Sequence, residues 1–176
     1  VTANFTDAGI MVHAYLMYGF PTQTIQETVD SLEMVRQLFE IGVIQSGFWH
    51  QFAMTAHSPV GMFPEEYNVI ANTNDITFAN NDVQFTDNSG IDHEQFSFGL
   101  RKSLFNFMHG ICFDYPLQDW FEFKIPKSTI PHDFIANAVE EGNSREVKAS
   151  AKLLYIGGKP SITNFIKSKK ITKNNI

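Results

Sequence analysis

The sequence predicts an α/β fold in which two parallel strands are joined by a helix, followed by a region of mixed α+β structure. Three observations support this prediction: an apolar run over residues 10–18, an amphipathic pattern over residues 25–41, and a second apolar run over residues 48–55. A near-continuous apolar run with β-branched and aromatic residues is typical of a strand covered on both faces. The order strand, helix, strand makes the two strands parallel through a right-handed crossover.

The helix between the two strands has recognisable start and stop signals. Thr24 and Glu27 have the spacing of a capping box, in which each residue accepts a hydrogen bond from the backbone amide of the other. Gly42 follows the pattern, where a left-handed residue would end the helix. The apolar stripe expected to face the strands consists of Ile25, Val29, Leu32, Val35 and Phe39.

The chain changes character after Pro59. Between residues 68 and 92, ten of 25 residues are asparagine or aspartate, which favour turns. Along this part of the chain we expect a hairpin from residues 76–78 and 83–85, followed by a helix over residues 92–110 and a strand over residues 120–125. A helix over residues 131–141, which ends before Gly142, and a second hairpin from residues 152–156 and 161–166 are expected to follow. The inward side of the first of these helices would carry Phe96, Leu100, Leu104 and Phe107 or Met108.

Composition excludes several classes of function. The net charge of −6 disfavours general nucleic-acid binding, and the five basic residues between Lys159 and Lys173 are expected to form a solvated tail. No apolar run approaches the roughly 18 residues of a membrane span. Cys112 is the single cysteine; we expect it to be a buried apolar residue, and it cannot form a disulfide or a cysteine-based metal site within the chain. These features predict a cytoplasmic protein that binds neither nucleic acid nor membrane.

The turn after the first strand is the first candidate site. Gly19 allows a flat ligand or another backbone to approach closely, and Pro21 stiffens the exit of the strand. Thr22, Gln23 and Thr24 place hydroxyl and amide groups at a helix N-terminus, which suits an anionic or amino-acid-like ligand. The same residues are also what a tight strand-to-helix turn without any ligand needs.

The end of the second strand is the second candidate. His57, beside Thr55, could hydrogen-bond a ligand or transfer a proton, or could simply be satisfied by the loop that follows it. His50 and His57 would point to opposite faces of a regular strand, so a shared metal is not expected. For His13 we expect a buried core position.

Two further pairs of neighbouring ionisable residues carry no catalytic prediction. We expect His93 and Glu94 to form a solvated pair rather than an acid/base pair. The same expectation holds for Glu65 and Glu66.

The strand, turn and helix over residues 13–32, with Gly19, Phe20 and Pro21 at the turn, resemble the fifth strand and following helix of radical SAM enzymes. Residues 48–59 resemble the sixth strand, the last of that family's partial TIM-type barrel. The resemblance is closest to radical SAM iron–sulfur oxidoreductases of the type that carries a B12-binding domain, and it covers residues 10 to 61. It implies a parallel β-α-β remnant of the barrel over residues 1–66 and an α+β C-terminal extension over residues 67–176.

The resemblance also implies which residues would contact S-adenosylmethionine. In the family the adenine lies against the turn after the fifth strand and the backbone of the sixth. The corresponding residues here are Gly19, Phe20, Pro21, Gln23, Met54, Thr55 and His57. Gln23 stands where relatives often have glutamate.

One family feature is missing from this chain. Radical SAM enzymes bind a [4Fe–4S] cluster through three cysteines of a CxxxCxxC loop, and such clusters need thiolate ligands. This chain has one cysteine, outside the resembling region, and it opens on Val1 rather than methionine. We therefore expect a C-terminal fragment that is inactive alone. The resemblance implies a parent that binds S-adenosylmethionine and a [4Fe–4S] cluster, with cobalamin as a candidate further cofactor.

Three alternatives for partners follow from the sequence. As a fragment, the chain would pair with the missing N-terminal half of the barrel and would self-associate through the exposed edge of its first strand. Its second possible role is a stand-alone α/β interaction module without catalysis. A nucleic-acid binder built from residues 131–173 is the weakest alternative, because the chain is acidic.

Overall fold

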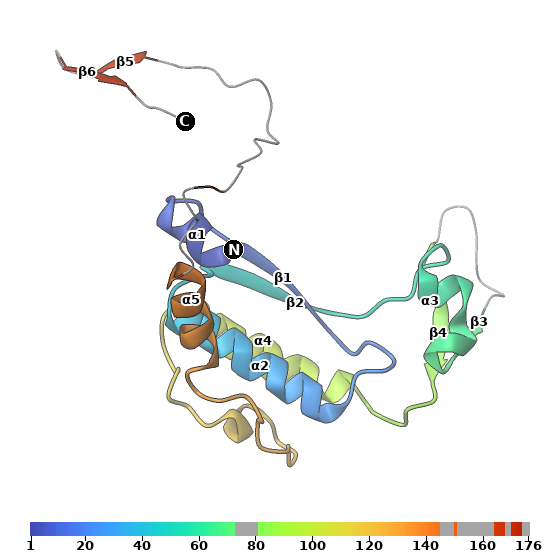
Figure 1. The fold of residues 1–176 in the computed structure, drawn as a ribbon. Coiled ribbons are helices and arrows are strands. Elements are labelled where there is room, and N and C mark those ends of the chain that lie inside the picture. The colour runs from blue at the N-terminus through green and yellow to red at the C-terminus, as the bar shows by residue number, and fades with distance from the viewer. Residues whose placement is uncertain (73–80, 145–149, 151–163, 168–169, 174–176) are drawn as a thin grey trace. The chain divides into compact units, whose positions relative to one another are not determined.

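The computed structural model describes residues 1–72, 81–144, 150, 164–167 and 170–173 (Figure 1). The chain forms two compact units, Val1–Ser144 and Arg145–Ile176. This division follows contacts in space, whereas the boundary expected after residue 66 follows the family resemblance and stays a prediction. None of the described helices is both long and apolar enough to cross a membrane.

The first unit contains the parallel strand pair that the sequence predicts. Strands β1 (His13–Tyr18) and β2 (Ser46–Gln51) run parallel, with His13 opposite Ser46 and Tyr18 opposite Gln51. Both strands are shorter than expected, and β2 is shifted towards the N-terminus. The expected strand extended to Thr55, but Thr55 forms only an isolated bridge to Asp82 because the chain leaves the sheet after Gln51.

The helix that joins these strands is α2 (Ile25–Glu40), and its predicted signals are confirmed. The Thr24 hydroxyl accepts a hydrogen bond from the Glu27 amide at 3.2 Å, and the Glu27 carboxylate accepts one from the Thr24 amide at 2.7 Å. Gly42 adopts a φ of +72° just beyond the helix, in the left-handed region that glycine enters most easily.

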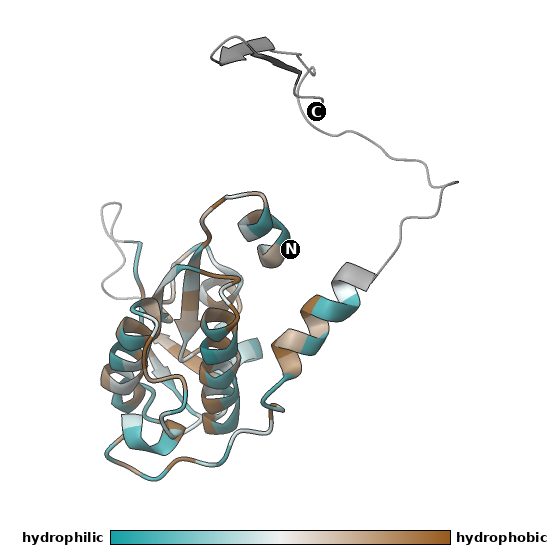
Figure 2. Ribbon diagram, turned by 90° about the vertical axis from the view of Figure 1, so that its left-hand side faces the viewer, coloured by the Kyte–Doolittle hydropathy of each residue, from teal (hydrophilic) through white to brown (hydrophobic). Residues whose placement is uncertain are grey.

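A second helix, α4 (Ser97–Met108), packs beside α2 and along β2, and a short 3₁₀ turn at Glu94–Phe96 precedes it. The predicted inward residues are buried: Phe96 in the 3₁₀ turn, and Leu100, Leu104 and Phe107 in α4. Met108 is 37% exposed. The main core fills the space between the strands and these helices. Figure 2 shows apolar and polar residues on both helices, as expected of helices with one buried face.

Strands β3 (Val69–Asn72) and β4 (Gln84–Asp87) form an antiparallel pair. A short helix, α3 (Pro59–Met62), and a 3₁₀ turn at Pro64–Tyr67 precede β3 in the chain. Another short helix, α1 (Thr2–Asp7), lies at the N-terminus, before β1. The hairpin predicted from residues 76–78 and 83–85 lies only in part within the described residues. Residues 84 and 85 do lie in a strand, but their partner is β3, and residues 76–78 lie outside the described part of the chain. A small second core supports this pair, with Met54, Val60, Val69 and Val83 as its buried members.

The strand predicted over residues 120–125 is wrong. A 3₁₀ turn at Leu117–Trp120 is followed by chain without regular structure. The side chain of Gln118 explains this, because its amide donates to the carbonyl of Phe123 at 2.8 Å and its oxygen accepts from the amide of Ile125 at 3.0 Å. These backbone groups are thus satisfied without a neighbouring strand, while Phe121 and Ile125 are buried in the main core.

Helix α5 (Phe134–Ser144) begins three residues later than predicted, and Gly142 lies inside it rather than after its end. The buried side chain of Gln37, on α2, fixes the start of α5. Its amide donates to the Pro131 carbonyl at 2.7 Å, and its oxygen accepts from the Ile135 amide at 3.0 Å. A side chain from another helix thus caps α5, which the local sequence does not reveal.

The second unit contains an antiparallel pair, β5 (Asn164–Lys167) and β6 (Lys170–Lys173), with Lys167 opposite Lys170. The predicted second hairpin placed residues 161–166 against residues 152–156, and the latter lie outside the described residues. Residues 164–166 do form a strand, but it pairs with residues that we expected in a solvated tail.

Candidate functional site

The carboxyl ends of β1 and β2 meet at one edge of the sheet, where ligands bind in α/β folds. The Tyr18 hydroxyl donates a hydrogen bond to the side-chain oxygen of Gln51 at 3.3 Å. Burial raises the pKa of the Tyr18 phenol, although a hydrogen bond with Ser97 opposes this, so the hydroxyl is a neutral donor at physiological pH. Gly19 follows with a φ of +76°, a conformation that favours glycine.

The turn at Gly19 is closed by Gln23. The side-chain oxygen of Gln23 accepts a hydrogen bond from the Gly19 amide at 2.6 Å, and the Gln23 amide donates to the Phe20 carbonyl at 2.7 Å. Pro21 is fully buried between them. The side-chain oxygen of Gln23 is therefore engaged by the turn itself, whereas its terminal NH₂ group makes no hydrogen bond to the described residues.

A hollow of about 370 Å³ lies at this turn and includes two residues of the predicted set, Phe20 and Gln23. Its other lining residues come from β1, the turn and α2: Met17, Thr22, Glu27 and Ser31. Hydrogen bonds from the Thr24 amide and hydroxyl lower the pKa of the Glu27 carboxyl. The hollow thus offers an aromatic ring, a thioether, two hydroxyls, an amide donor and an ionised carboxylate.

The remaining predicted residues lie outside this hollow. Met54 is 1% exposed and belongs to the small second core, against which Phe20 also packs. The Thr55 carbonyl accepts a hydrogen bond from the Ser58 hydroxyl at 2.8 Å, and His57 is exposed. The structure therefore brings Phe20 and Met54 into one cluster, and it leaves Thr55 and His57 apart from the hollow.

His93 is the residue that sequence reasoning missed. We expected a solvated pair with Glu94, but the His93 side chain is 6% exposed and its Nε2 lies 3.5 Å from the Asp87 carboxylate. A Cβ added to Gly19 would lie 3.1 Å from the Cβ of His93, so the histidine occupies the space beside the glycine. Both ring nitrogens lack a hydrogen-bond partner within the described residues. No local pattern signals this burial, because Asp87 and Gly19 belong to other elements.

One face of the β1–β2 pair is uncovered within the part of the chain that the structure describes. It presents Tyr15, Met17 and Phe48, which are 69%, 49% and 47% exposed. The rings of Tyr15 and Phe48 lie 5.8 Å apart, as do those of Tyr15 and His50. His13, expected in the core, is exposed on this face and its Nδ1 lies 2.8 Å from the Ser46 hydroxyl.

The structure also bears on possible metal sites and on the single cysteine. Among the described residues, no group of three or more histidine, cysteine or acidic side chains could hold a metal ion. Cys112 is partly rather than fully buried, packs against the main core, and has a φ of +65°.

Comparison of the chain with protein-family models, with curated proteins and with solved structures finds no match in any of the three. The mixed α/β fold, with one parallel and two antiparallel strand pairs among the described residues, therefore stands on the structure alone.

Proposed function

We propose that this chain is the carboxyl-terminal part of a radical SAM iron–sulfur enzyme of the type that carries a B12-binding domain. In this proposal β1, α2 and β2 are the last strand–helix–strand unit of a partial TIM-type barrel, and the turn after β1 contributes part of the edge that binds the adenine of S-adenosylmethionine. The observation that carries the proposal is a parallel strand pair that, among the described residues, is covered by helices on one face only.

Parallel sheets in proteins are covered on both faces. Here α2 and α4 cover one face, while the face with Tyr15, Met17 and Phe48 exposes large apolar side chains. A barrel wall has this asymmetry, because its helices lie outside and the opposite face of each strand lines the interior. Further strands beside β1 would complete such a wall and enclose the aromatic side chains.

The hollow at the turn has groups that suit an adenine ring. Phe20 offers a ring for stacking, and the free NH₂ group of Gln23 can donate a hydrogen bond to a ring nitrogen. Met17 adds an apolar wall. Gly19 contributes the turn geometry, since His93 fills the space beside it.

The cluster ligands would have to come from elsewhere in the parent protein. A [4Fe–4S] cluster needs thiolates, and this chain has Cys112 alone. In the parent, the cluster would supply the electron that cleaves S-adenosylmethionine, and cobalamin would be a second cofactor. This chain's own contribution would be to position the nucleoside, in a parent that we place in the cytoplasm.

Binding of the nucleoside can be tested on this chain without a cluster. S-adenosylhomocysteine titrated into ¹⁵N-labelled protein should shift the amide signals of Gly19 and Gln23. Phe20→Leu should weaken binding about fivefold or more, because stacking on an aromatic ring contributes about 1–3 kcal/mol per base. Phe52→Leu is the matched control, since Phe52 packs on Phe20 with ring centroids 5.0 Å apart but does not line the hollow. Equal weakening by both variants, or no shift at Gly19, would contradict the proposed site.

Membership of the family is tested separately on the parent. The reading frame should continue upstream of Val1 and encode CxxxCxxC about 150–200 residues before residue 10, given about 25–30 residues per strand–helix unit. The intact parent, reconstituted anaerobically with iron and sulfide, should then cleave S-adenosylmethionine reductively. A natural start near Val1 would favour the second candidate, a stand-alone interaction module that uses the same uncovered face.

Separated from its neighbours, the chain should self-associate. Among the described residues β1 pairs with β2 alone, so its other edge offers unpaired backbone groups beside an apolar face. Light scattering at increasing concentration should show growth in mass. A monomer at all concentrations would refute this expectation.

A further inference from the structure

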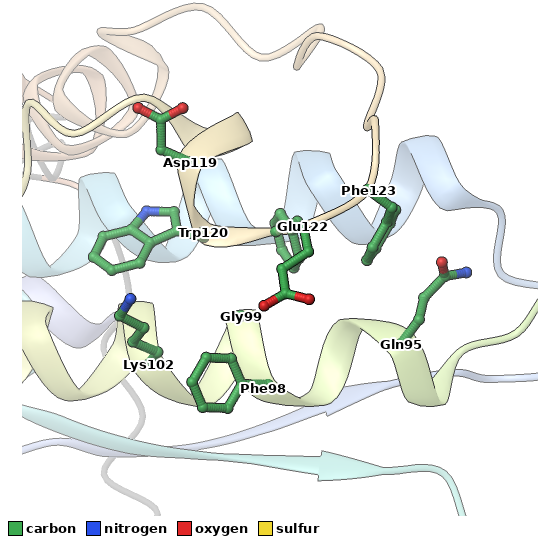
Figure 3. Close-up of a pocket in the computed structure, with 9 residues that line it drawn as sticks. Gln95, Phe98, Gly99, Lys102, Asp119, Trp120, Glu122 and Phe123 are labelled. Carbon is green, nitrogen blue, oxygen red and sulfur yellow. The ribbon is translucent and has the colours of Figure 1, made fainter.

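A second cavity, of about 520 Å³, lies between α4 and the segment of residues 119–123 (Figure 3). Its volume is within the range of small-molecule sites. Residues of both sides line it, among them Phe98 and Lys102 from α4 and Asp119, Trp120, Glu122 and Phe123 from the segment. None of these residues lines the hollow at the turn after β1.

Gly99 allows the two walls of this cavity to approach closely. A Cβ at residue 99 would lie 2.4 Å from Cε1 of Phe121 and 2.7 Å from the Trp120 carbonyl oxygen. The segment therefore rests on the backbone of α4, and the buried side chains of Trp120 and Phe121 anchor it in the main core. Anchoring of this kind gives the cavity a defined shape.

The charged side chains around the cavity have opposite signs and are not paired with each other. The Lys102 ammonium lies over the rings of Phe98 and Trp120, 5.9 and 6.0 Å from their centroids. Within the described residues, neither it nor the carboxylates of Asp119 and Glu122 forms an ion pair. Figure 3 shows Lys102 reaching from α4 towards Trp120 and Glu122 reaching from the segment towards α4.

The indole ring of Trp120 forms part of the wall of this cavity. Trp120 is 5% exposed, and its Nε1 has no hydrogen-bond partner among the described residues. Figure 3 shows this nitrogen on the edge of the indole that lies away from Lys102. Trp120 therefore offers the cavity its aromatic ring, over which the Lys102 ammonium lies.

We propose that this cavity binds a free α-amino acid with an aromatic side chain. Its carboxylate would meet Lys102, its ammonium would meet Glu122, and its ring would lie on the aromatic wall. A simple anion would also meet the Glu122 carboxylate, and a simple cation would also meet the Lys102 ammonium. A zwitterion, in contrast, can place its negative group at Lys102 on α4 and its positive group at Glu122 on the segment.

The test uses the full chain and the two indole N–H signals of its ¹⁵N spectrum. Titration with L-phenylalanine should shift the Trp120 indole signal, with a dissociation constant on the order of 1 mM. The Trp49 indole should not shift, because Trp49 lies on the helix-covered face of β2 and does not line the cavity. Phenethylamine, which lacks the carboxylate, and 3-phenylpropanoate, which lacks the ammonium, should each bind at least fivefold more weakly.

Two variants assign the charges, and a third is the control. Lys102→Gln should remove the preference for L-phenylalanine over phenethylamine, and Glu122→Gln should reduce the preference over 3-phenylpropanoate. Each change should weaken L-phenylalanine binding about fivefold, the upper range for a solvent-accessible ion pair. Lys124→Gln changes an exposed charge outside the cavity and should leave binding unchanged. Absence of a Trp120 shift in the millimolar range, or equal binding of phenethylamine to the wild type, would overturn the proposal.

Discussion

Replacing Gly99 with alanine is expected to destabilise the protein, although alanine is the better helix former. In a helix interior this exchange normally stabilises by about 0.8–1.0 kcal/mol. At residue 99 the new methyl group would lie 2.4 and 2.5 Å from two ring carbons of Phe121 and 2.7 Å from the Trp120 carbonyl oxygen. Overpacking of a core costs about 1–3 kcal/mol, and the upper part of that range applies because a backbone atom is among those that must move. The net expectation is a loss of about 1–2 kcal/mol.

The control for this prediction is a second helical glycine. Gly142 lies inside α5, and a Cβ added there would have nothing within 4 Å. Gly142→Ala should therefore stabilise the helix by up to about 1 kcal/mol, and less near the helix end. Urea unfolding followed by circular dichroism measures both free energies of unfolding, and the Gly99→Ala melting temperature should fall by about 2–8 °C. If Gly99→Ala were as stable as the wild type, the close approach of residues 119–123 to α4 would be wrong.

Three further substitutions test the polar contacts of α2 by the same unfolding assay. Burial alone would raise the pKa of Asp30, but hydrogen bonds from the Thr129 hydroxyl and amide outweigh it and hold the pKa below its ordinary value. Asp30→Asn should therefore lower the free energy of unfolding by about 1 kcal/mol at pH 7. This difference from the wild type should shrink as the pH falls below about 4, because the wild-type carboxyl then becomes protonated. A difference that does not depend on pH would refute the assignment. Thr24→Ala removes the side-chain half of the capping box and should cost about 1 kcal/mol, and an unchanged free energy of unfolding would count against the cap. Arg36→Ala removes the ionic partner of the Glu33 carboxylate, which is 9% exposed, and should lower the free energy of unfolding by about 3 kcal/mol. The double variant Arg36→Met with Glu33→Leu should recover most of that loss. If it does not, the two charges are themselves needed for stability.

The elements that the sequence predicts well are those specified by neighbouring residues. Thr24, Glu27 and Gly42 mark both ends of α2 within a few residues of the helix itself. The parallel direction of β1 and β2 follows from the helix between them. Likewise, the spacing of apolar residues identifies the buried side of α4.

The elements that the sequence predicts poorly depend on partners far along the chain. Gln118 satisfies the backbone that an alternating pattern assigns to a strand, and Gln37 caps a helix that begins almost a hundred residues later. At the candidate site, the closure of the turn by Gln23 is a local contact, whereas the burial of His93 beside Gly19 and Asp87 is not. Such contacts can be recognised only once the elements are placed in space.

The two apolar cores of the first unit differ greatly in size, and this difference has a consequence for motion on slow timescales. The small core has four buried residues, Met54, Val60, Val69 and Val83, and supports β3 and β4. Regions with few buried contacts open at lower free energy than the rest of a protein. Amide protons of β3 and β4 should therefore exchange with solvent long before those of α2, and each such opening would release the support beneath the ring of Phe20.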